Sequence, residues 1–283
     1  MKIVLSSKEM QGFSKELIRQ NQTIGFVPTM GFLHEGHLSL VDQSTKACDV
    51  TVMSIFVNPL QFGPNEDFDR YPRNIEQDIE LARRAGVDFL FCPTVDDLYS
   101  KELPVTMTAT KRTNVLCGAS RPGHFDGVVS VLTVLFNIVQ PQKAFFGRKD
   151  AQQVAVVQGL VDAYHFPIEV IAVDTVREED GLAKSSRNVY LTDEERQQAP
   201  MLSRALNSAA EALSGKSIEQ TIDDMTSFLK ETTSGKIDYI QILHYPELEP
   251  VVEKKGEIII ALAVQFAHAR LIDNIVLTLK EEK

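Results

Sequence analysis

The sequence predicts an α/β fold: a Rossmann-like, doubly wound parallel sheet followed by a smaller C-terminal α+β domain. Over residues 23–173, short apolar runs typical of strands alternate with helical patterns, which favours a parallel sheet covered by helices on both faces. Beyond that stretch the order changes, since two helical patterns come first and three strand patterns follow. A chain of 283 residues suits one large or two modest domains. We therefore expect a domain of residues 1–180 and a second of residues 181–283.

Hydrophobic periodicity places the elements in order. In the first domain we expect strands at 23–27, 50–56, 87–91, 144–146 and 168–173, and helices at 36–47, 74–85, 125–139 and 150–164. In the second we expect helices at 192–213 and 218–232, then strands at 237–244, 257–264 and 270–279. The stretch 125–139 is apolar nearly all round, which predicts a helix buried on several sides, with one edge available for a pocket wall or a subunit interface.

Composition narrows the function classes. The chain has 29 Lys and Arg against 39 Asp and Glu, a net charge of -10, whereas nucleic-acid binding normally needs a cationic surface. Its three cysteines show no C-x-x-C spacing, so reduced thiols are favoured over a disulfide framework or a zinc ribbon. Residues 1–8 lack the apolar core of a signal peptide, and no run approaches membrane-spanning length. We expect a soluble cytoplasmic protein with no nucleic-acid or membrane partner.

The most informative segment, P-T-M-G-F-L-H-E-G-H at 28–37, lies where a predicted strand turns into a helix. His34 and His37 are three residues apart, so their rings share one face of the first helical turn. Unpaired backbone N–H groups and the helix dipole favour phosphate there, and Gly31 lets a nucleotide approach the backbone. A zincin would need H-E-x-x-H, one residue longer, and no third histidine has ligand spacing. The segment therefore predicts an ATP site, with two surface histidines as the alternative.

Two further segments carry polar and basic residues. K-S-S-R at 184–187 puts a lysine, two hydroxyls and an arginine within four residues, which can surround a triphosphate or form a plain solvated loop. The segment 145–153 again runs from a strand into a helix. There Lys149 can offer a point charge to phosphate and Gly147 can leave room for a base or ribose, or Lys149 is simply a surface lysine on a capped helix.

Together these segments resemble the H-x-G-H and K-M-S-K-S-like signatures of the nucleotidyltransferase superfamily. Five ordered motifs are similar to those of the pantoate–beta-alanine ligase (pantothenate synthetase) family: P-T-M-G-F-L-H-E-G-H at 28–37, F-V-N-P-L-Q-F at 56–62, R-P-G-H-F-D-G-V at 121–128, F-G-R-K-D-A-Q-Q at 146–153 and K-S-S-R-N at 184–188. They extend over about two thirds of the chain, and no motif follows Asn188.

The resemblance implies an ATP-dependent condensation of (R)-pantoate with beta-alanine. Pantoate would attack the α-phosphorus of ATP to give pantoyl adenylate and pyrophosphate, and beta-alanine would then release AMP and pantothenate. ATP is the co-substrate, Mg2+ the expected ion and a homodimer the expected assembly. Two alternatives stay open: another small-molecule adenylyltransferase, which would leave AMP on its product, and a non-catalytic nucleotide-binding protein on the same fold.

The resemblance also assigns site residues. His37 is the candidate proton donor, since histidine titrates near neutrality, and His34 and Lys149 act with it. The expected ATP-binding residues are Met30, Gly31, His34, His37, Gly147, Arg148, Lys149, Asp150, Val176, Lys184, Ser185, Ser186 and Arg187. Gln61 and Gln153 match the pantoate ligands of the family, and Gln61 can also reach beta-alanine. No residue is assigned as a direct metal ligand; Asp78 and Asp150 could contact Mg2+ only through water.

Overall fold

The structure, a computed structural model, describes residues 1–64, 66, 68–99 and 104–279. The chain divides into two compact units, which are described separately. The first comprises residues 1–110, 121–147 and 156–174, and the second comprises residues 111–120, 148–155 and 175–283. Three stretches of the first 180 residues, 111–120, 148–155 and 175–180, therefore belong with the C-terminal part of the chain.

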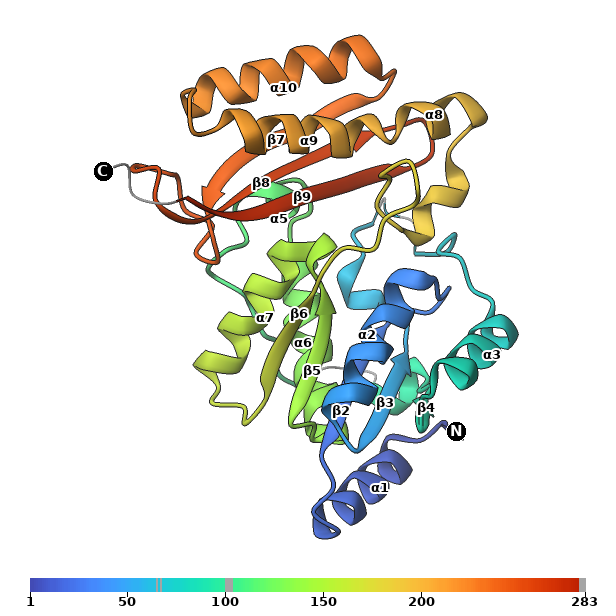
Figure 1. The fold of residues 1–283 in the computed structure, drawn as a ribbon. Coiled ribbons are helices and arrows are strands. Elements are labelled where there is room, and N and C mark those ends of the chain that lie inside the picture. The colour runs from blue at the N-terminus through green and yellow to red at the C-terminus, as the bar shows by residue number, and fades with distance from the viewer. Residues whose placement is uncertain (65, 67, 100–103, 280–283) are drawn as a thin grey trace. The chain divides into compact units, whose positions relative to one another are not determined.

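The first unit is built on a six-stranded, all-parallel sheet in the order β1-β4-β3-β2-β5-β6 (Figure 1). The strands are β1 (Lys2–Val4), β2 (Ile24–Thr29), β3 (Val50–Ile55), β4 (Phe89–Phe91), β5 (Lys143–Gly147) and β6 (Glu169–Val173). From β2 the chain builds outward through β3 on one side, and it later adds β5 on the other. The order thus reverses between β2 and β5, and in such sheets ligands bind beyond the carboxyl ends of the strands at that point.

Helices cover both faces of this sheet. They are α1 (Ser7–Arg19), α2 (Glu35–Ala47), α3 (Ile75–Ala85), α4 (Val95–Leu98), α6 (His124–Val139) and α7 (Ala151–Ala163), whose first five residues belong to the second unit. Val27 of β2 is buried in one cluster with Val41 of α2, whereas the ring of neighbouring Phe26 meets the edge of Phe136 in α6. Successive strand residues point to opposite faces, so α2 and α6 lie on opposite sides of the sheet. The predicted doubly wound arrangement is confirmed.

Helix α6 is mostly core, as its sequence predicts. Ten of its sixteen residues are buried. Gly127 lies against the backbone of the 3-10 helix η1 (Pro59–Gln61), because a Cβ atom added to it would fall 2.1 Å from the carbonyl oxygen of Leu60. A buried helix thus supports a turn that carries a candidate site residue.

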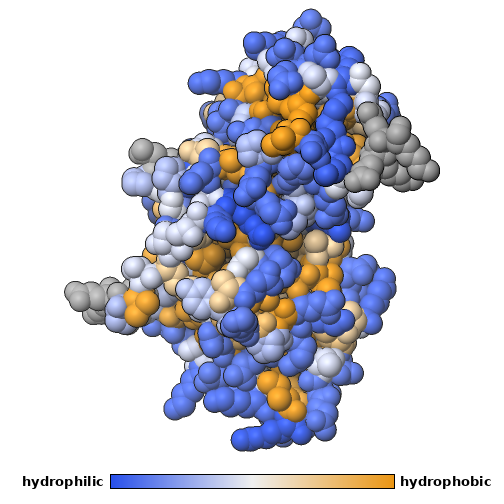
Figure 2. Space-filling view, turned by 90° about the vertical axis from the view of Figure 1, so that its left-hand side faces the viewer, coloured by the Kyte–Doolittle hydropathy of each residue, from blue (hydrophilic) through white to orange (hydrophobic). Residues whose placement is uncertain are grey.

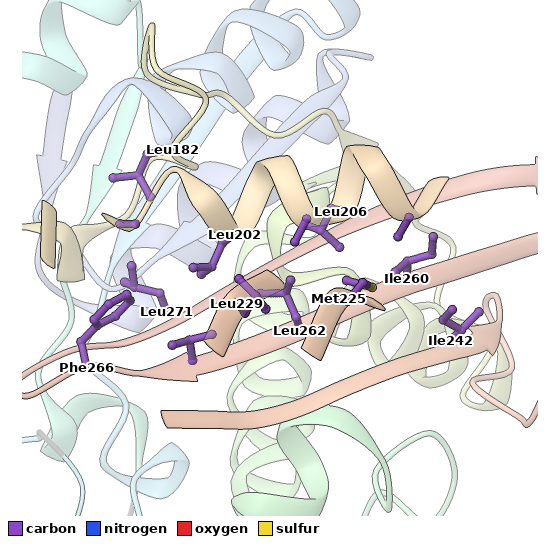
Figure 3. Close-up of a cluster of buried hydrophobic side chains, with 14 of the residues drawn as sticks. Leu182, Leu202, Leu206, Met225, Leu229, Ile242, Ile260, Leu262, Phe266 and Leu271 are labelled. Carbon is purple, nitrogen blue, oxygen red and sulfur yellow. The ribbon is translucent and has the colours of Figure 1, made fainter. Parts of the chain in front are cut away.

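The second unit is a three-stranded antiparallel sheet with two helices on one face. Its strands are β7 (Lys236–His244), β8 (Gly256–Gln265) and β9 (Arg270–Leu279), in sequential order, and the helices are α9 (Met201–Ala212) and α10 (Ile218–Thr232). Ile260 and Leu262 of β8 are buried in one cluster with Leu206 of α9 and Leu229 of α10 (Figure 3). The other face of β8 carries Ile259 and Ala261, which pack with Leu116 of α5 (Leu116–Ser120) and Ala151 of α7. The smaller α+β fold expected here is confirmed.

The single helix predicted at 192–213 is wrong. The chain forms α8 (Asp193–Gln198) and then α9, with a break at Ala199 and Pro200. Proline has no backbone N–H to donate to the preceding turn, so it ends the first helix and can begin the next. The helix predicted to start at residue 150 starts at Ala151 instead, because residues 148–150 form the 3-10 helix η2 (Arg148–Asp150).

One face of the molecule is drawn in space-filling form in Figure 2. On the face shown in Figure 2, hydrophilic residues cover most of the surface, and hydrophobic residues form separate patches. Within the described part of the chain, no helix combines the length and the apolar character needed to cross a bilayer.

Candidate active site

Two histidines cap the helix that follows the central strand β2. His34 is the N-cap residue of α2: its Nδ1 accepts a hydrogen bond from the backbone N–H of Gly36 at 3.1 Å, while its own N–H donates to Nδ1 of His37 at 3.3 Å. The two ring centroids lie 4.1 Å apart. Because Nδ1 accepts in both rings, each neutral imidazole carries its proton on Nε2, on the far side of the ring from these backbone contacts.

This reciprocal cap corrects one expectation from the sequence. The N–H of Gly36 bonds to the His34 ring, and the N–H of His37 bonds to the His34 carbonyl at 2.8 Å, so these two amides are not available for phosphate. His34 also precedes the helix instead of lying within its first turn. The cap uses Nδ1 of both rings, so their Nε2–H groups take no part in it.

A buried carboxylate fixes the turn between β2 and His34. Met30 and Gly31 follow the strand, and Gly31 and Phe32 both have left-handed backbone conformations, with φ of 84° and 52°. Asp78 of α3, 2% exposed, accepts hydrogen bonds from the N–H groups of Phe32 at 2.8 Å and Leu33 at 2.7 Å. A Cβ atom on Gly31 would come within 2.9 Å of the same carboxylate. Both oxygens of Asp78 thus position the histidine turn, which argues against the water-mediated contact with Mg2+ expected from the sequence.

Gln61 lies at the end of η1, just after β3, and is 9% exposed. Asn58, fully buried, donates through Nδ2 to the Gln61 side-chain oxygen and to the Gly127 carbonyl, both at 3.0 Å. The Tyr99 hydroxyl donates to Oδ1 of Asn58 at 3.0 Å, and burial raises the pKa of that hydroxyl far above its ordinary value, which keeps it a neutral donor. Because its oxygen is occupied, Gln61 presents its amide N–H2 group. Asn58 was missed in the sequence, although it lies within F-V-N-P-L-Q-F.

The motif R-P-G-H-F-D-G-V supports the backbone of the same turn. Nδ1 of His124 and Nη2 of Arg121 both lie within hydrogen-bond distance of the Gln61 carbonyl, at 2.8 and 3.3 Å. The Arg121 guanidinium also forms an ion pair with Glu66. Burial tends to raise the pKa of Glu66, but the hydrogen bonds and charge of Arg121 outweigh it, and the pKa lies below its ordinary value of 4.5. Arg121 and His124 therefore act as positioning residues. The sequence analysis quoted their motif as part of the family resemblance but assigned neither residue a role.

The basic segment after β5 begins at the end of the first unit and continues in the second. Gly147 ends the strand, and a Cβ atom on it would meet nothing within 4 Å, so the space beside it is open. The 3-10 helix η2 follows directly, with Arg148 and Asp150 exposed and Lys149 half-buried.

The two adjacent glutamines of the same motif have different environments. Gln152 is 6% exposed, and its amide donates to the carbonyl oxygens of Arg112 at 2.9 Å and Val115 at 2.8 Å. Gln153 is half-buried, and its side chain has no hydrogen-bond partner among the described residues. Only Gln153, the residue assigned from the sequence, is therefore available to a ligand.

The K-S-S-R segment follows a short hairpin of the second unit. The carbonyl of Val176 accepts from the N–H of Lys184 at 2.9 Å, and Arg177 forms a β-bridge with Ala183. Leu182 in this hairpin is 4% exposed and anchors it in the cluster shown in Figure 3. Lys184 thus leaves the hairpin from a fixed backbone position.

The segment itself is an ordered turn and not a freely solvated loop. The hydroxyl of Ser185 accepts from the N–H of Arg187 at 3.2 Å and caps the 3-10 helix η3 (Ser186–Tyr190). Asn188 donates to the carbonyl of Ala183 at 3.1 Å, which closes the loop. Ser186 is 8% exposed, whereas Lys184, Ser185 and Arg187 are half-buried.

The site residues fall into two groups by unit. β3, β2 and β5 are adjacent and parallel, so the residues that follow their carboxyl ends lie at one edge of the sheet: Met30, Gly31, His34, His37, Gln61 and Gly147. The second unit carries the remaining residues, Arg148, Lys149, Asp150, Gln153, Val176, Lys184, Ser185, Ser186 and Arg187.

Paired imidazole donors at the switch point of a parallel sheet, together with an ordered K-S-S-R turn, define an α/β protein of the nucleotidyltransferase type. The model of the pantoate–beta-alanine ligase family matches residues 2–276, and the chain belongs to this family. It is 55% identical to pantothenate synthetase of Bacillus subtilis (strain 168) over 282 residues, 99% of each chain. It is 53% identical to pantothenate synthetase of Staphylococcus haemolyticus (strain JCSC1435) over 279 residues, 98% of each chain.

Solved structures agree. The crystal structure of pantothenate synthetase from Thermus thermophilus has a TM-score of 0.91 and 43% identity, and the match covers 97% of this chain and 99% of that chain. The ligase from Francisella tularensis, complexed with beta-gamma ATP and beta-alanine, has a TM-score of 0.79 and 34% identity over 98% of this chain and 97% of that chain. The family resemblance and the fold class predicted from the sequence are both confirmed.

Proposed function

We propose that this chain catalyses the ATP-dependent condensation of (R)-pantoate with beta-alanine to pantothenate through a pantoyl adenylate. The chain is a member of the pantoate–beta-alanine ligase family over nearly its whole length. The observation that carries the mechanism is the reciprocal cap of His34 and His37, which turns both Nε2–H donors away from the backbone of the turn at the switch point of the sheet.

In the first half-reaction a carboxylate oxygen of pantoate forms a bond to the α-phosphorus of ATP. The bond from that phosphorus to the bridging oxygen breaks, and pyrophosphate leaves with the electron pair. Such transfers are catalysed mainly by positioning and by stabilising charge on phosphate oxygens. His34 and His37 would donate Nε2–H to those oxygens, with His37 as the proton donor, while Lys149, Lys184 and Arg187 would supply positive charge.

Pantoate would be held by neutral amides. Gln61 offers N–H2, because its oxygen already accepts from Asn58, and Gln153 offers a carboxamide with no protein partner among the described residues. An amide binds hydroxyl and carboxylate oxygens without the full charge that would weaken a carboxylate nucleophile. In the second half-reaction the amine of beta-alanine attacks the acyl carbon, the acyl–phosphate C–O bond breaks, and AMP leaves.

Mg2+ would enter with ATP as part of the co-substrate. In the part of the chain that the structure describes, no group of three His, Cys, Asp or Glu side chains could hold a metal ion, and the oxygens of Asp78 accept backbone N–H groups. The donor set therefore fits an ion carried chiefly by phosphate oxygens, as is common for Mg2+. At most an exposed carboxylate such as Asp150 would contact it through water.

We also propose a cytoplasmic homodimer, in which residues 1–180 bind ATP and pantoate and residues 181–283 begin with the K-S-S-R turn. All three cysteines are free thiols, as a reducing compartment favours. Light scattering of the purified protein should give twice the chain mass of 31.6 kDa.

Isotope exchange tests the proposed reaction. With pantoate and MgATP, labelled pyrophosphate should enter ATP, because adenylate formation is reversible and needs no amine; beta-alanine alone should not support exchange. Release of ADP, or exchange that required beta-alanine, would contradict the adenylate mechanism. A product that kept AMP would favour another adenylyltransferase, and ATP binding without turnover would favour a non-catalytic protein.

A further inference from the structure

Two adjacent polar residues are buried on strand β9. Asp273 is 3% and Asn274 is 9% exposed, in a strand whose other residues are largely apolar. Burying a carboxylate or an amide is costly unless it is fully paired, so both side chains need partners. Neither residue belongs to a motif that the sequence analysis identified.

Their side chains lie on opposite faces of the small sheet. Asp273 pairs with Leu262 of β8, which faces the helices, and Asn274 pairs with Ala261, which faces the opposite cluster. Because β9 is an edge strand, a polar side chain on each face can reach a segment that passes beside the sheet. One strand can thereby hold two separate segments.

Asp273 holds the hairpin that leads to the K-S-S-R turn. The guanidinium of Arg177 donates to both carboxylate oxygens, at 2.6 and 2.9 Å, and its Nη1 also donates to the carbonyl of Gly181 at 3.1 Å. A bidentate pair of this kind fixes direction as well as distance. The hairpin ends at Lys184, whose N–H bonds to Val176 next to Arg177. The position of Lys184 is thus tied to β9.

Asn274 holds the other basic segment. Its Nδ2 donates one hydrogen to the carbonyl of Arg148 at 3.0 Å and the other to the carbonyl of Lys149 at 2.8 Å. Both acceptors are carbonyl oxygens, so the amide must present its nitrogen to them. The backbone that carries Lys149 is therefore fixed to the residue that follows Asp273.

We propose that Asp273 and Asn274 are positioning residues that set Lys149 and Lys184 in register with each other for the phosphates of ATP. The inference rests on the proposed function, because it takes both lysines as phosphate contacts. All the contacts that carry it lie within the second unit. Adjacent residues on a hydrogen-bonded strand have fixed positions relative to each other, so each side chain anchors its own basic segment to one common strand.

The test uses Asn274→Ala and Asp273→Asn in the full chain, with Asp238→Asn as the matched control. Asp238 also pairs with an arginine of β9, Arg270, but this pair touches neither basic segment. Adenylate formation, measured by pyrophosphate exchange at saturating ATP, should fall about tenfold or more in both test variants and less than twofold in the control. The second half-reaction, started from preformed pantoyl adenylate and beta-alanine, should change less than threefold.

Double variants separate positioning from a general effect on folding. Asn274→Ala should cause less than a twofold further loss in a Lys149→Ala background, but its full loss in a Lys184→Ala background, and Asp273→Asn should show the reverse pattern. Equal losses in all backgrounds, or wild-type exchange in Asn274→Ala, would overturn the inference. If Asn274→Ala folds poorly, Asn274→Asp replaces it, because this variant keeps the side-chain volume and its carboxylate cannot donate a hydrogen bond. Its pyrophosphate exchange should be equally slow. Wild-type exchange in a folded Asn274→Asp would also overturn the inference.

Failure of the proposed function would look different. A wild-type protein with no pyrophosphate exchange would refute the adenylate reaction. The positioning role would then be tested by measuring the affinity of the same variants for MgATP by calorimetry. A loss of affinity confined to the test variants would support the positioning role, and unchanged affinity would overturn it.

Discussion

The contact between Gly127 and the turn that carries Gln61 gives the sharpest test of the site geometry. A Cβ atom on Gly127 would lie 2.1 Å from the carbonyl oxygen of Leu60 and 2.7 Å from the N–H nitrogen of Gln61. Ordinary contact begins at 3.4 Å, so the Leu60 oxygen would have to retreat by about 1.3 Å, that is 3.4 less 2.1. The contacted atoms, the carbonyl group of Leu60 and the nitrogen of Gln61, all belong to the backbone, so no flexible side chain can absorb this shift.

The expected effect of Gly127→Ala is larger on catalysis than on stability. Overpacking costs about 1 to 3 kcal/mol, and the gain in helix propensity from Gly to Ala returns about 1 kcal/mol. A displacement of about 1 Å in a positioning group can cost on the order of a hundredfold in rate. We therefore expect the pantoate kcat/KM for adenylation to fall about ten- to a hundredfold, with a modest loss of unfolding free energy.

The assay is pyrophosphate exchange as a function of pantoate concentration, paired with urea unfolding. Gly12→Ala in α1 is the matched control, because an added Cβ there meets nothing within 4 Å. It should leave the kinetics unchanged and stabilise the fold by up to about 1 kcal/mol. Wild-type kcat/KM in folded Gly127→Ala would refute the claim that α6 sets the position of Gln61.

Three further outcomes follow from the site. His37→Ala should slow adenylation about a hundredfold or more in single-turnover experiments, since it removes an Nε2–H donor whose bond strengthens as charge builds on phosphate. Gln153→Ala should weaken pantoate binding by about 1 to 3 kcal/mol in calorimetry, with ATP affinity unchanged. Gln152→Ala should instead lower the unfolding free energy by a similar amount, because two partly buried carbonyls lose their donor. Glu66→Gln should make the unfolding free energy fall less steeply at acid pH. The pKa of Glu66 is lowered in the folded protein, so its contribution to stability is complete above its unfolded pKa of about 4.5 and is lost as pH falls through the folded value. An unchanged acid dependence in urea titrations would contradict its pairing with Arg121.

The fold was predictable because its signals are local. Apolar runs and helical periods give the central strands and helices to within a few residues. The three-residue strand β1 is too short for a period to register. Helix α1 was missed although Ser6 and Glu9 have the spacing of a capping box and Arg19 lies in its last turn. The predicted helix at 192–213 is divided because Pro200, which has no backbone N–H, interrupts an otherwise continuous helical pattern.

The site was predictable only as a set of motif residues. Which of two adjacent glutamines faces a ligand is decided by Arg112 and Val115, which lie about forty residues away and occupy Gln152. Asp78 lies more than forty residues from the turn that it clamps, and no spacing rule connects the two. The proton position of each histidine likewise follows from a backbone contact that only the folded turn creates.

The site residues supply chemically different groups, and the proposed reaction needs that difference. The first unit offers donors that are neutral when the imidazoles are unprotonated, namely the Nε2–H groups of His34 and His37 and the amide of Gln61. The second unit offers the basic side chains of Lys149 and Lys184, and also the neutral amide of Gln153. A carboxylate nucleophile stays reactive only if nearby charge does not hold it too strongly, whereas a departing pyrophosphate is stabilised most by full positive charge. Asp273 and Asn274 fix the backbones of the Lys184 and Lys149 segments within the second unit, so under the proposed function the spacing of these two cations is set before the triphosphate binds.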